Sequence, residues 1–503
     1  MDLPPLIMKY HIRKVRTGSN NIAVQVIEYV NRKRVVAEHI GSAHNDDELK
    51  LLLDNASKWI AEKTKQISLF PEREPFISLD QLEYLGFQYT FLYDTLFKLQ
   101  ARLGYTSFGI KLLNDLITIR IIEPASKLRS LELLETYFNI KHRRQSLYDM
   151  LPKLLKLKNK VEELTLNFAV KEFNFDFTIV FYDVTTLYFE SFKADDFRNT
   201  GFSKDNKPNQ PQIVIGLVVN KEGFPVSYDI FPGRTFEGHT LIPVIKDFKK
   251  KHKIKNLTVV ADAAMISAEN IESLKEAQID YIVGARLGNL KAEIINSLDK
   301  KLVRTDSANI RLKTKLGYLI CDFSKKRFAK DKFEMGKQIL KAKQLLQYPG
   351  KTKKVKFIKT NTKAENKLNT ELIKKTTMLL GIKGYYTNLG EKILSNELVI
   401  ERYHQLYKIE HAFRISKHDL KTRPIFHYKK DPIKLHILIC FMALAVSKYI
   451  ELKTNWSIRS FLSECKKITD AKLLNKINNK IITKRVPLSK EVLILIKQLN
   501  LPH

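Results

Sequence analysis

Two aspartates stand where buried β-strands would carry them. Asp183 lies within the run Phe177–Phe189, whose β-branched and aromatic residues predict a strand buried on both faces. Asp262 closes the apolar run LTVVAD, ahead of a helix that Ser267 is positioned to cap. Each aspartate also has a purely structural explanation. Strand-end aspartates often form turns or caps, and a buried aspartate can pair with Arg or Lys.

A glutamate interrupts the apolar face of a helix predicted from residue 399 to residue 420. Steps of four and three residues give its inward stripe, Val399, Tyr403, Leu406, Glu410, Phe413, Lys417 and Leu420. A carboxylate turned inward requires a partner charge, a hydrogen-bonding network or a metal, because leaving it bare costs several kcal/mol. A helix-surface cluster of Glu410 with His411, Arg414 or Lys417 is the alternative.

Together, the three acids suit a pair of divalent ions. Two carboxylates on buried strands and one on the inner face of a helix can converge on one pocket. Hard oxygen ligands of this kind favour Mg²⁺ or Mn²⁺. We therefore predict a metal centre held by Asp183, Asp262 and Glu410.

Further motifs surround these acids. Tyr403, Glu410 and Lys417 are spaced as in a Tyr-x2-Arg-x3-Glu-x6-Lys signature, with Leu406 at the Arg position and Arg414 as the candidate for the missing cation. The segments YDVTTLYFE, FPGRTFEGHTL and VVADAAMIS complete the set. On these motifs the chain resembles the DDE transposases of bacterial insertion sequences, in the branch that carries this signature around its catalytic Glu. The resemblance spans residues 177–449.

The resemblance implies two-metal phosphoryl transfer on DNA. In such an enzyme Asp183 shares both ions, while Asp262 completes one and Glu410 the other; the ions are two Mg²⁺, which Mn²⁺ can replace. One ion activates a water or a 3′-OH for in-line attack, and the other stabilises the leaving oxygen. Cut-and-paste movement through a hairpin is common in the family. The implied partners are double-stranded transposon ends and target DNA, bound by a homodimer on paired ends.

Several side chains are expected to contact DNA. The resemblance implies that the signature Tyr and Lys grip terminal phosphates. The expected contacts are Tyr403, Lys417, Arg414, Arg234 and Arg423. Arg234 lies close to a helix entrance at Thr240, where a helix N-terminus favours phosphate, although capping by Thr235 or Thr240 explains the same residues equally well. Glu237 is a spare acid in this stretch.

The composition favours a polyanionic partner. The 503 residues include 87 Lys and Arg against 54 Asp and Glu, a formal net charge of +33. Ribosomal and membrane-surface proteins share such a charge, so the charge alone does not decide the partner. The three cysteines Cys321, Cys440 and Cys465 have no paired spacing, and no disulfide framework or zinc site is expected.

The chain is expected in the cytoplasm, at the bacterial nucleoid. Its N-terminus is too polar for a signal peptide. Its longest apolar stretch, LHILICFMALAV, is shorter than the ~18 residues that a membrane span requires. We expect neither a membrane partner nor a small-molecule substrate.

Periodicity and the resemblance predict an α/β chain with a ribonuclease-H-like mixed sheet, interrupted by an insertion and preceded by a small β-meander and a helical DNA-binding region. The expected units are a β-meander plus helix over 1–75 with a linker at 71–75, a helical DNA-end-binding region over 76–172, a first catalytic part over 173–286, the insertion over 287–385, a second catalytic part with the Glu helix over 386–450, and a basic helical tail over 451–503. In the insertion, the Lys-rich run 351–367 is a candidate DNA contact.

Two other functions remain open at this stage. A nuclease or resolvase on the same fold would keep the three acids without end recognition or strand transfer. A DNA-binding protein descended from a transposase would have lost the chemistry altogether.

Overall fold

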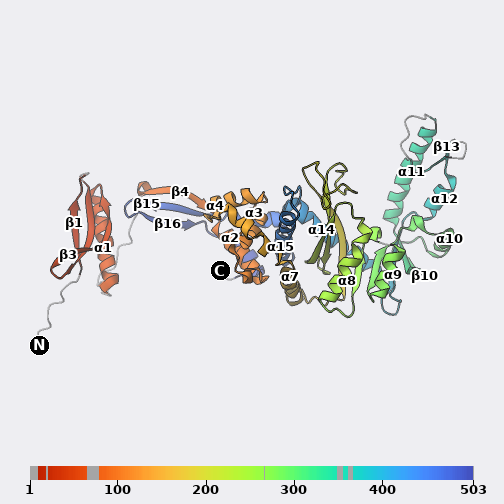
Figure 1. Ribbon diagram of the computed structural model, residues 1–503, viewed down its shortest axis with the longest axis horizontal. Helices are drawn as coiled ribbons and strands as arrows, with labels where there is room; N and C mark the ends of the chain where they lie inside the picture. Colours follow the sequence, from red (N-terminus) through yellow and green to blue (C-terminus); the bar gives the residue numbers. More distant parts are fainter. Residues whose placement is uncertain are drawn as a thin grey trace.

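The protein is elongated, and its parts follow one another along the long axis (Figure 1). The computed structural model describes residues 10–18, 21–64, 79–265, 267–347, 355–360 and 366–501. The N-terminal module lies at one end and the insertion at the other, with a helical region and a central sheet between them. The linker expected at 71–75 lies outside the described residues.

Residues 10–64 form the N-terminal module. Its elements are the antiparallel strands β1 (Tyr10–Arg16), β2 (Ile22–Val30) and β3 (Lys33–Ala43), followed by α1 (Asp46–Thr64). Val24 and Val26 of β2 pack on Leu52 and Ala56 of α1 in a small core. Ile477, from the far end of the chain, completes that core.

Helices dominate the next region. They are α2 (Thr90–Arg102), α3 (Lys111–Ile122), α4 (Lys127–Phe138), α5 (Arg144–Asp149), α6 (Leu151–Leu155) and α7 (Lys158–Phe173). Every residue of α3 after the first is buried. Helix α3 packs against α15 (Lys430–Thr454), which joins this region to the central sheet in one continuous hydrophobic core.

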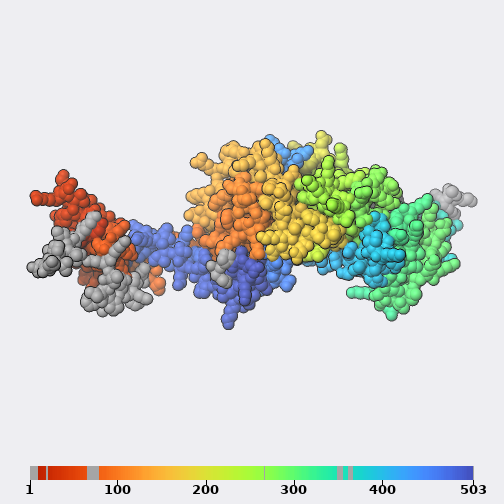
Figure 2. Space-filling view, turned by 90° about the horizontal axis from the view of Figure 1, so that it is seen from below, coloured from red at the N-terminus to blue at the C-terminus, as the bar shows by residue number. Residues whose placement is uncertain are grey.

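The C-terminal segment differs from the helical tail expected for 451–503. Its elements are α16 (Ile458–Cys465), the hairpin strands β15 (Asp470–Asn475) and β16 (Lys480–Arg485), and α17 (Lys490–Gln498). Strand β15 also pairs with β4 (Leu82–Gln88), and this long-range pairing leaves no local pattern in the sequence. Figure 2 shows this segment, in blue, reaching from the central body to the N-terminal module.

The central sheet carries the candidate site. Its first three strands, β5 (Ile179–Tyr188), β6 (Gln212–Val219) and β7 (Pro225–Pro232), are antiparallel neighbours. Strands β8 (Thr258–Ala261) and β9 (Asp280–Gly284) then run parallel to β5, which gives the order β7-β6-β5-β8-β9. Three antiparallel strands followed by two parallel ones in this order confirm the predicted ribonuclease-H-like sheet.

The insertion extends this sheet. Beyond β9 come β14 (Ile382–Thr387), β11 (Gly317–Phe323) and β10 (Asn309–Thr314), so the sheet has eight strands among the described residues. Because β14 pairs directly with β9, the boundary expected at 287 does not separate two sheets. The remaining elements of the insertion are α10 (Ala292–Lys301), α11 (Lys325–Gln347), α12 (Thr370–Met378), and the strand pair β12 (Ile358–Thr360) and β13 (Asn366–Leu368).

Helices cover both faces of the sheet (Figure 1). Tyr182 of β5 points toward α8 (Leu241–Lys251), since its hydroxyl donates to Thr240 just before that helix. Side chains alternate along a strand, so Asp183 and Thr185 point to the other face, where α15 packs. Helix α15 is long and apolar enough to span a membrane, but 94% of its apolar window is buried inside the protein. It is the central helix of the core.

Candidate active site

Asp183 and Asp262 occupy neighbouring positions in the sheet. Strands β5 and β8 are parallel neighbours, and Tyr182 of β5 is in register with Ala261 of β8. The next residue of each strand is an aspartate. The structure therefore brings these two predicted residues together, at the point where β8 ends and α9 (Ala268–Glu276) follows.

The surroundings of Asp183 favour its neutral form. Its side chain is 14% exposed. Burial raises the pKa of this carboxyl to about 6, and repulsion from Asp262 and Glu237 adds to the rise. The ammonium of Lys204 and the backbone N–H of Val184, which donates to Oδ1 at 2.7 Å, oppose it. Asp183 is thus a carboxylate in need of positive charge, which a bound cation would supply.

A lysine from the loop after β5 lies between two acids. Lys204 Nζ is 3.7 Å from Asp183 Oδ1 and 3.2 Å from Glu237 Oε1, and it donates to the carbonyl of Val184 at 2.7 Å. Glu237, in the turn before α8, is therefore a neighbour of Asp183 rather than an isolated spare acid. Lys204 is a residue that the sequence analysis missed. In the sequence Lys204 is one lysine in a polar loop, and only the three-dimensional fold brings that loop back against β5.

Tyr403 joins Asp262 to the helical side of the site. It lies in α13 (Asn396–His404), and its hydroxyl donates to Asp262 Oδ1 at 3.1 Å. Burial raises the pKa of Tyr403, and the carboxylates of Asp262, Glu410 and Asp183 each add to the rise. Of the signature residues, Tyr403 is therefore the one that lies among all three predicted acids.

Glu410 does not face inward as predicted. The helix expected from 399 to 420 is interrupted after His404, and a separate helix α14 (Tyr407–Arg414) carries Glu410. Leu406 and Phe413 are buried as predicted, but the break shifts the helical phase between them, so that Ile409 and Ala412 are also buried and Glu410 is exposed. Its carboxylate remains near enough to influence the pKa of Tyr403.

A second lysine, unmarked in the sequence, lies against Tyr403. Lys383 of β14 places its Nζ 4.7 Å from the centre of the Tyr403 ring. Burial lowers the pKa of Lys383, and Arg327 lowers it further, whereas Asp262 and Glu410 counteract the decrease. Lys383 is therefore a cation beside two of the predicted acids. It comes from the insertion, whose predicted DNA contact, the Lys-rich run 351–367, lies partly outside the described residues.

Lys417 and Arg423 are brought together by an acid. Lys417 Nζ lies 3.2 Å and Arg423 Nη2 lies 3.3 Å from Asp205 Oδ1. Asp205 directly follows Lys204 in the same loop. Burial lowers the pKa of Lys417, and Asp205 acts against that shift. Two predicted phosphate contacts thus share one carboxylate in the protein without DNA.

The other two predicted cations lie on the surface, and Arg414 follows Glu410 by one turn of α14. Arg414 is exposed on α14 and influences the pKa values of His411 and Lys448 rather than that of Tyr403. Arg234 is exposed, and its backbone N–H donates to Asn199 Oδ1 at 2.7 Å. Leu406, at the signature Arg position, is 6% exposed in the core. Leu406 therefore provides no charge at that position, and Arg414 as the substitute cation stays a prediction.

Two of the predicted helix caps, Ser267 and Thr240, have different outcomes. Ser267 caps α9, because its hydroxyl accepts the N–H of Asn270 at 3.0 Å. Thr240 stands at the N-cap position of α8, but its hydroxyl does not cap that helix. It accepts from Tyr182 and donates to the carbonyl of Glu237 at 2.6 Å. Thr240 therefore supports the turn that carries Glu237.

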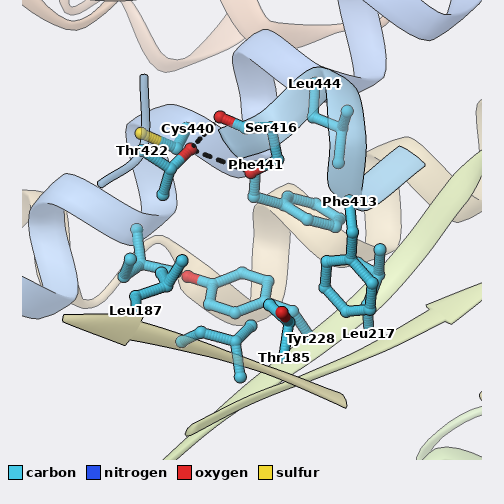
Figure 3. Close-up of a pocket in the computed structure, with 12 residues that line it drawn as sticks. Thr185, Leu187, Leu217, Tyr228, Phe413, Ser416, Thr422, Cys440, Phe441 and Leu444 are labelled. Atoms are coloured by element: carbon cyan, nitrogen blue, oxygen red, sulfur yellow. Dashed lines mark hydrogen bonds between the residues drawn. The ribbon is translucent and has the colours of Figure 1, made fainter. Parts of the chain in front are cut away.

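Behind the site, α14 and α15 pack on the sheet around an apolar void of about 30 Å³ (Figure 3). Phe413 projects into this layer beside Leu217. The hydroxyls of Ser416 and Thr422 lie 2.8 Å apart, and Thr422 also donates to the carbonyl of Ser416 at 2.7 Å. These bonds fix the π-helical turn Ile415–Asp419, which carries Lys417.

The surroundings of Asp183 and Asp262 suit a hard divalent cation, whereas the third predicted acid, Glu410, is exposed on α14. In the part of the chain that the structure describes, no three Asp, Glu, His or Cys side chains lie close enough to hold a metal ion. At Asp183, however, burial and neighbouring carboxylates disfavour the bare anion, and Lys204 already places one positive charge beside it. Oε1 of Glu237 is buried without a hydrogen bond, and its charged neighbour is Lys204 at 3.2 Å. The donor set consists entirely of carboxylate oxygens, which suits Mg²⁺ or Mn²⁺.

The model of a known protein family, described as "Transposase DDE domain", matches residues 174–446, a little over half of the chain. Among solved structures, a piggyBac transposase synaptic complex with hairpin DNA is 11% identical, with a TM-score of 0.36, over 80% of this chain and 74% of that chain. A Mos1 transposase paired-end complex with the left transposon end is 12% identical, with a TM-score of 0.16, over 46% of this chain and 66% of that chain. No curated protein matches the chain.

Proposed function

The chain belongs to the transposase DDE domain family and is a DNA transposase, and from this premise we propose that it binds the terminal inverted repeats of an insertion sequence, cuts its ends and joins them to a target. The observation that carries the proposal is the side-by-side placement of Asp183 and Asp262, with Tyr403 bonded to Asp262. We propose cut-and-paste movement by a homodimer on paired ends.

Asp183, Asp262 and Glu410 would hold the divalent ions. When bound, such ions lower the pKa of an attacking water and stabilise the negative charge on the departing oxygen. Because Glu410 is exposed on α14, it remains accessible to a metal that arrives with DNA. Tyr403 fixes the orientation of Asp262 through its hydrogen bond. Lys204 neutralises Asp183 and Glu237 until the ions are present.

Lysines and an arginine around the acids would bind the DNA backbone. Lys383 contacts the ring of Tyr403 and lies near Asp262 and Glu410, so it would replace the missing signature Arg as the cation at this place. Lys417 and Arg423 are held together by Asp205, which occupies the place of a phosphate between them. A DNA phosphate that displaces Asp205 would gain two charge-assisted contacts. The net charge of +33 attracts the polyanion from a distance.

A transposition assay tests this function. A donor plasmid would carry a marker between the DNA flanks of the gene for this chain, and a second plasmid would serve as target. We expect excision of the marker and its insertion into the target, with a short target duplication at each junction. Excision must be lost in Asp183→Asn and retained in the loop control Asp196→Asn.

The same assay distinguishes the alternatives. A nuclease or resolvase would cut the donor without joining the ends to the target. A protein that only binds DNA would leave both plasmids intact. Either result would contradict the proposal.

A further inference from the structure

A basic cavity lies beside the candidate site, between the helical region and the segment after the Glu helix. Its volume is about 280 Å³. The C-terminal end of α3 contributes Arg120, and the turn before α4 contributes Ser126. The opposite wall contributes Arg423, His427 and His436. None of the residues that line the cavity is acidic.

Two cations, one in the wall of this cavity and one behind it, are deeply buried. Arg120 is 6% exposed and donates to the carbonyl of Ala125 at 2.7 Å. Lys127, the first residue of α4, is 9% exposed, and its Nζ lies 2.6 Å from His427 Nε2. Long basic side chains are seldom buried to this extent without a paired acid. Among the described residues, these two buried cations therefore lack the counter-charge that such side chains ordinarily have.

Burial and the neighbouring cations lower the pKa of both Lys127 and His427. Burial lowers the pKa of Lys127 to about 7, and the neighbouring Arg120 lowers it further. Burial also lowers the pKa of His427 to about 3, with Lys127 and Arg120 adding to the decrease. An anion in the cavity would reverse these effects by offering each cation the missing opposite charge.

The cavity is joined to the candidate site through Arg423. This guanidinium lines the cavity, while its Nη2 reaches Asp205 beside Lys417. Its Nε is buried and has no hydrogen-bond partner. The segment that carries it is attached to the catalytic sheet, because Ile425 forms a β-bridge with Phe189 at the end of β5. The cavity and the side chain of Lys417 are therefore linked through Arg423 and Asp205.

We propose that this cavity binds a phosphate group of the DNA backbone, with Arg120 and Arg423 of its lining as the cationic contacts and with Lys127, which lies behind His427, as a buried positive charge that strengthens the site. The N-terminus of α4, capped by Ser126, adds its partial positive charge on the same side. The assignment to DNA rests on the proposed function, whereas the capacity for phosphate rests on the cavity alone. The site would fix the path of the strand where it leaves the catalytic acids.

Inorganic phosphate is the first probe. Thermal unfolding of the full chain would be followed with phosphate and with chloride at matched ionic strength. Phosphate should raise Tm in the wild type, because it binds the folded state. In Lys127→Met and Arg120→Gln, the affinity for phosphate should fall about tenfold or more. Arg129→Gln removes an exposed cation from the same helix and should respond as the wild type does.

Lys127→Met also separates binding from folding. It removes a buried charge while keeping the volume of the side chain, so without phosphate its Tm should be equal to or above that of the wild type. No phosphate response in the wild type, or an undiminished response in Lys127→Met, would overturn the site.

A competition experiment with DNA identifies the source of the phosphate. A duplex with 5′-hydroxyl ends, in which every phosphate is an internal diester, should compete with inorganic phosphate in the wild type. If the duplex binds without displacing phosphate, the assignment to DNA is overturned. Phosphate binding in the absence of any DNA cleavage would count against the proposed function and still support the phosphate site.

Discussion

The carboxylate of Asp183 is held where its charge is costly until a cation arrives. Asp183 and Asp262 could be predicted from the sequence, because an acidic residue within an apolar, strand-forming run stands out without any knowledge of the fold. Lys204, Glu237 and Lys383 could not be ranked in the same way. Each belongs to a common residue type and comes close to the acids only because a loop folds back or because two strands pair. Loop folding and strand pairing leave no periodic pattern in the sequence.

Asp183→Asn should make the metal-free protein more stable. Since the pKa of Asp183 is raised in the folded state to about 6, the folded chain binds the proton more tightly than the unfolded chain does. The free energy of unfolding therefore falls as pH rises from about 4 to about 6, and stays lower above that range. At neutral pH the variant should gain up to about 3 kcal/mol.

Chemical denaturation in EDTA at neutral pH and at mildly acidic pH measures this difference. It should shrink at the acidic pH, and Mg²⁺ should stabilise the wild type but not Asp183→Asn. Asp196→Asn, in an exposed loop, is the control and should show no gain. A variant less stable than the wild type in EDTA would contradict the electrostatic account of this residue.

Lys383→Met should weaken DNA binding through one lost phosphate contact. Because each phosphate contact releases counterions, the slope of log affinity against log salt should become shallower by about one. Fluorescence anisotropy over a salt series provides the measurement. Lys392→Met, which removes an exposed lysine just beyond β14, should change the affinity less. Equal effects of the two substitutions would refute a specific contact at Lys383.

At the scale of elements, the order of strands and helices determines which predicted residues meet. Apolar runs rich in β-branched residues were sufficient to predict β5 and β8. They failed at Glu410, because the break between α13 and α14 shifts the helical phase and no glycine or proline marks it. They also failed to predict that the insertion's strands continue the catalytic sheet, since pairing partners are chosen by three-dimensional contact.

Gly284 provides a test of how β9 positions Tyr403. A Cβ at this glycine would lie 2.4 Å from the Tyr403 hydroxyl and 3.0 Å from Ala263. Gly284→Ala should therefore displace Tyr403 and reduce DNA cleavage to the level of Tyr403→Phe, without loss of fold by circular dichroism. Gly288→Ala meets no atom within 4 Å and should retain full activity. Full activity in Gly284→Ala would show that the bond from Tyr403 to Asp262 is dispensable.

At the scale of the whole molecule, the C-terminal hairpin β15–β16 contacts the N-terminal module far from the acids. Ile477, in the turn of the C-terminal hairpin, is 6% exposed in the core of the N-terminal module. Ile477→Ser should weaken that docking by about 2 kcal/mol, since most of one aliphatic side chain is lost from an apolar contact. Hydrogen exchange should then accelerate in β2 and α1 and remain unchanged in β5. Ile481→Ser, exposed on β16, should have no such effect.

The proposed chemistry requires three carboxylates that act together on DNA, and one cleavage experiment tests this requirement directly. An end-labelled duplex from the DNA flanking the gene would be incubated in Mg²⁺ with the wild type, Asp183→Asn, Asp262→Asn and Glu410→Gln. Glu401→Gln, exposed on α13, is the matched control for Glu410. Each of the three site variants should bind the duplex and cut it at least about 100-fold more slowly, while the control cuts normally. Undiminished cleavage by any one of the three would contradict the account.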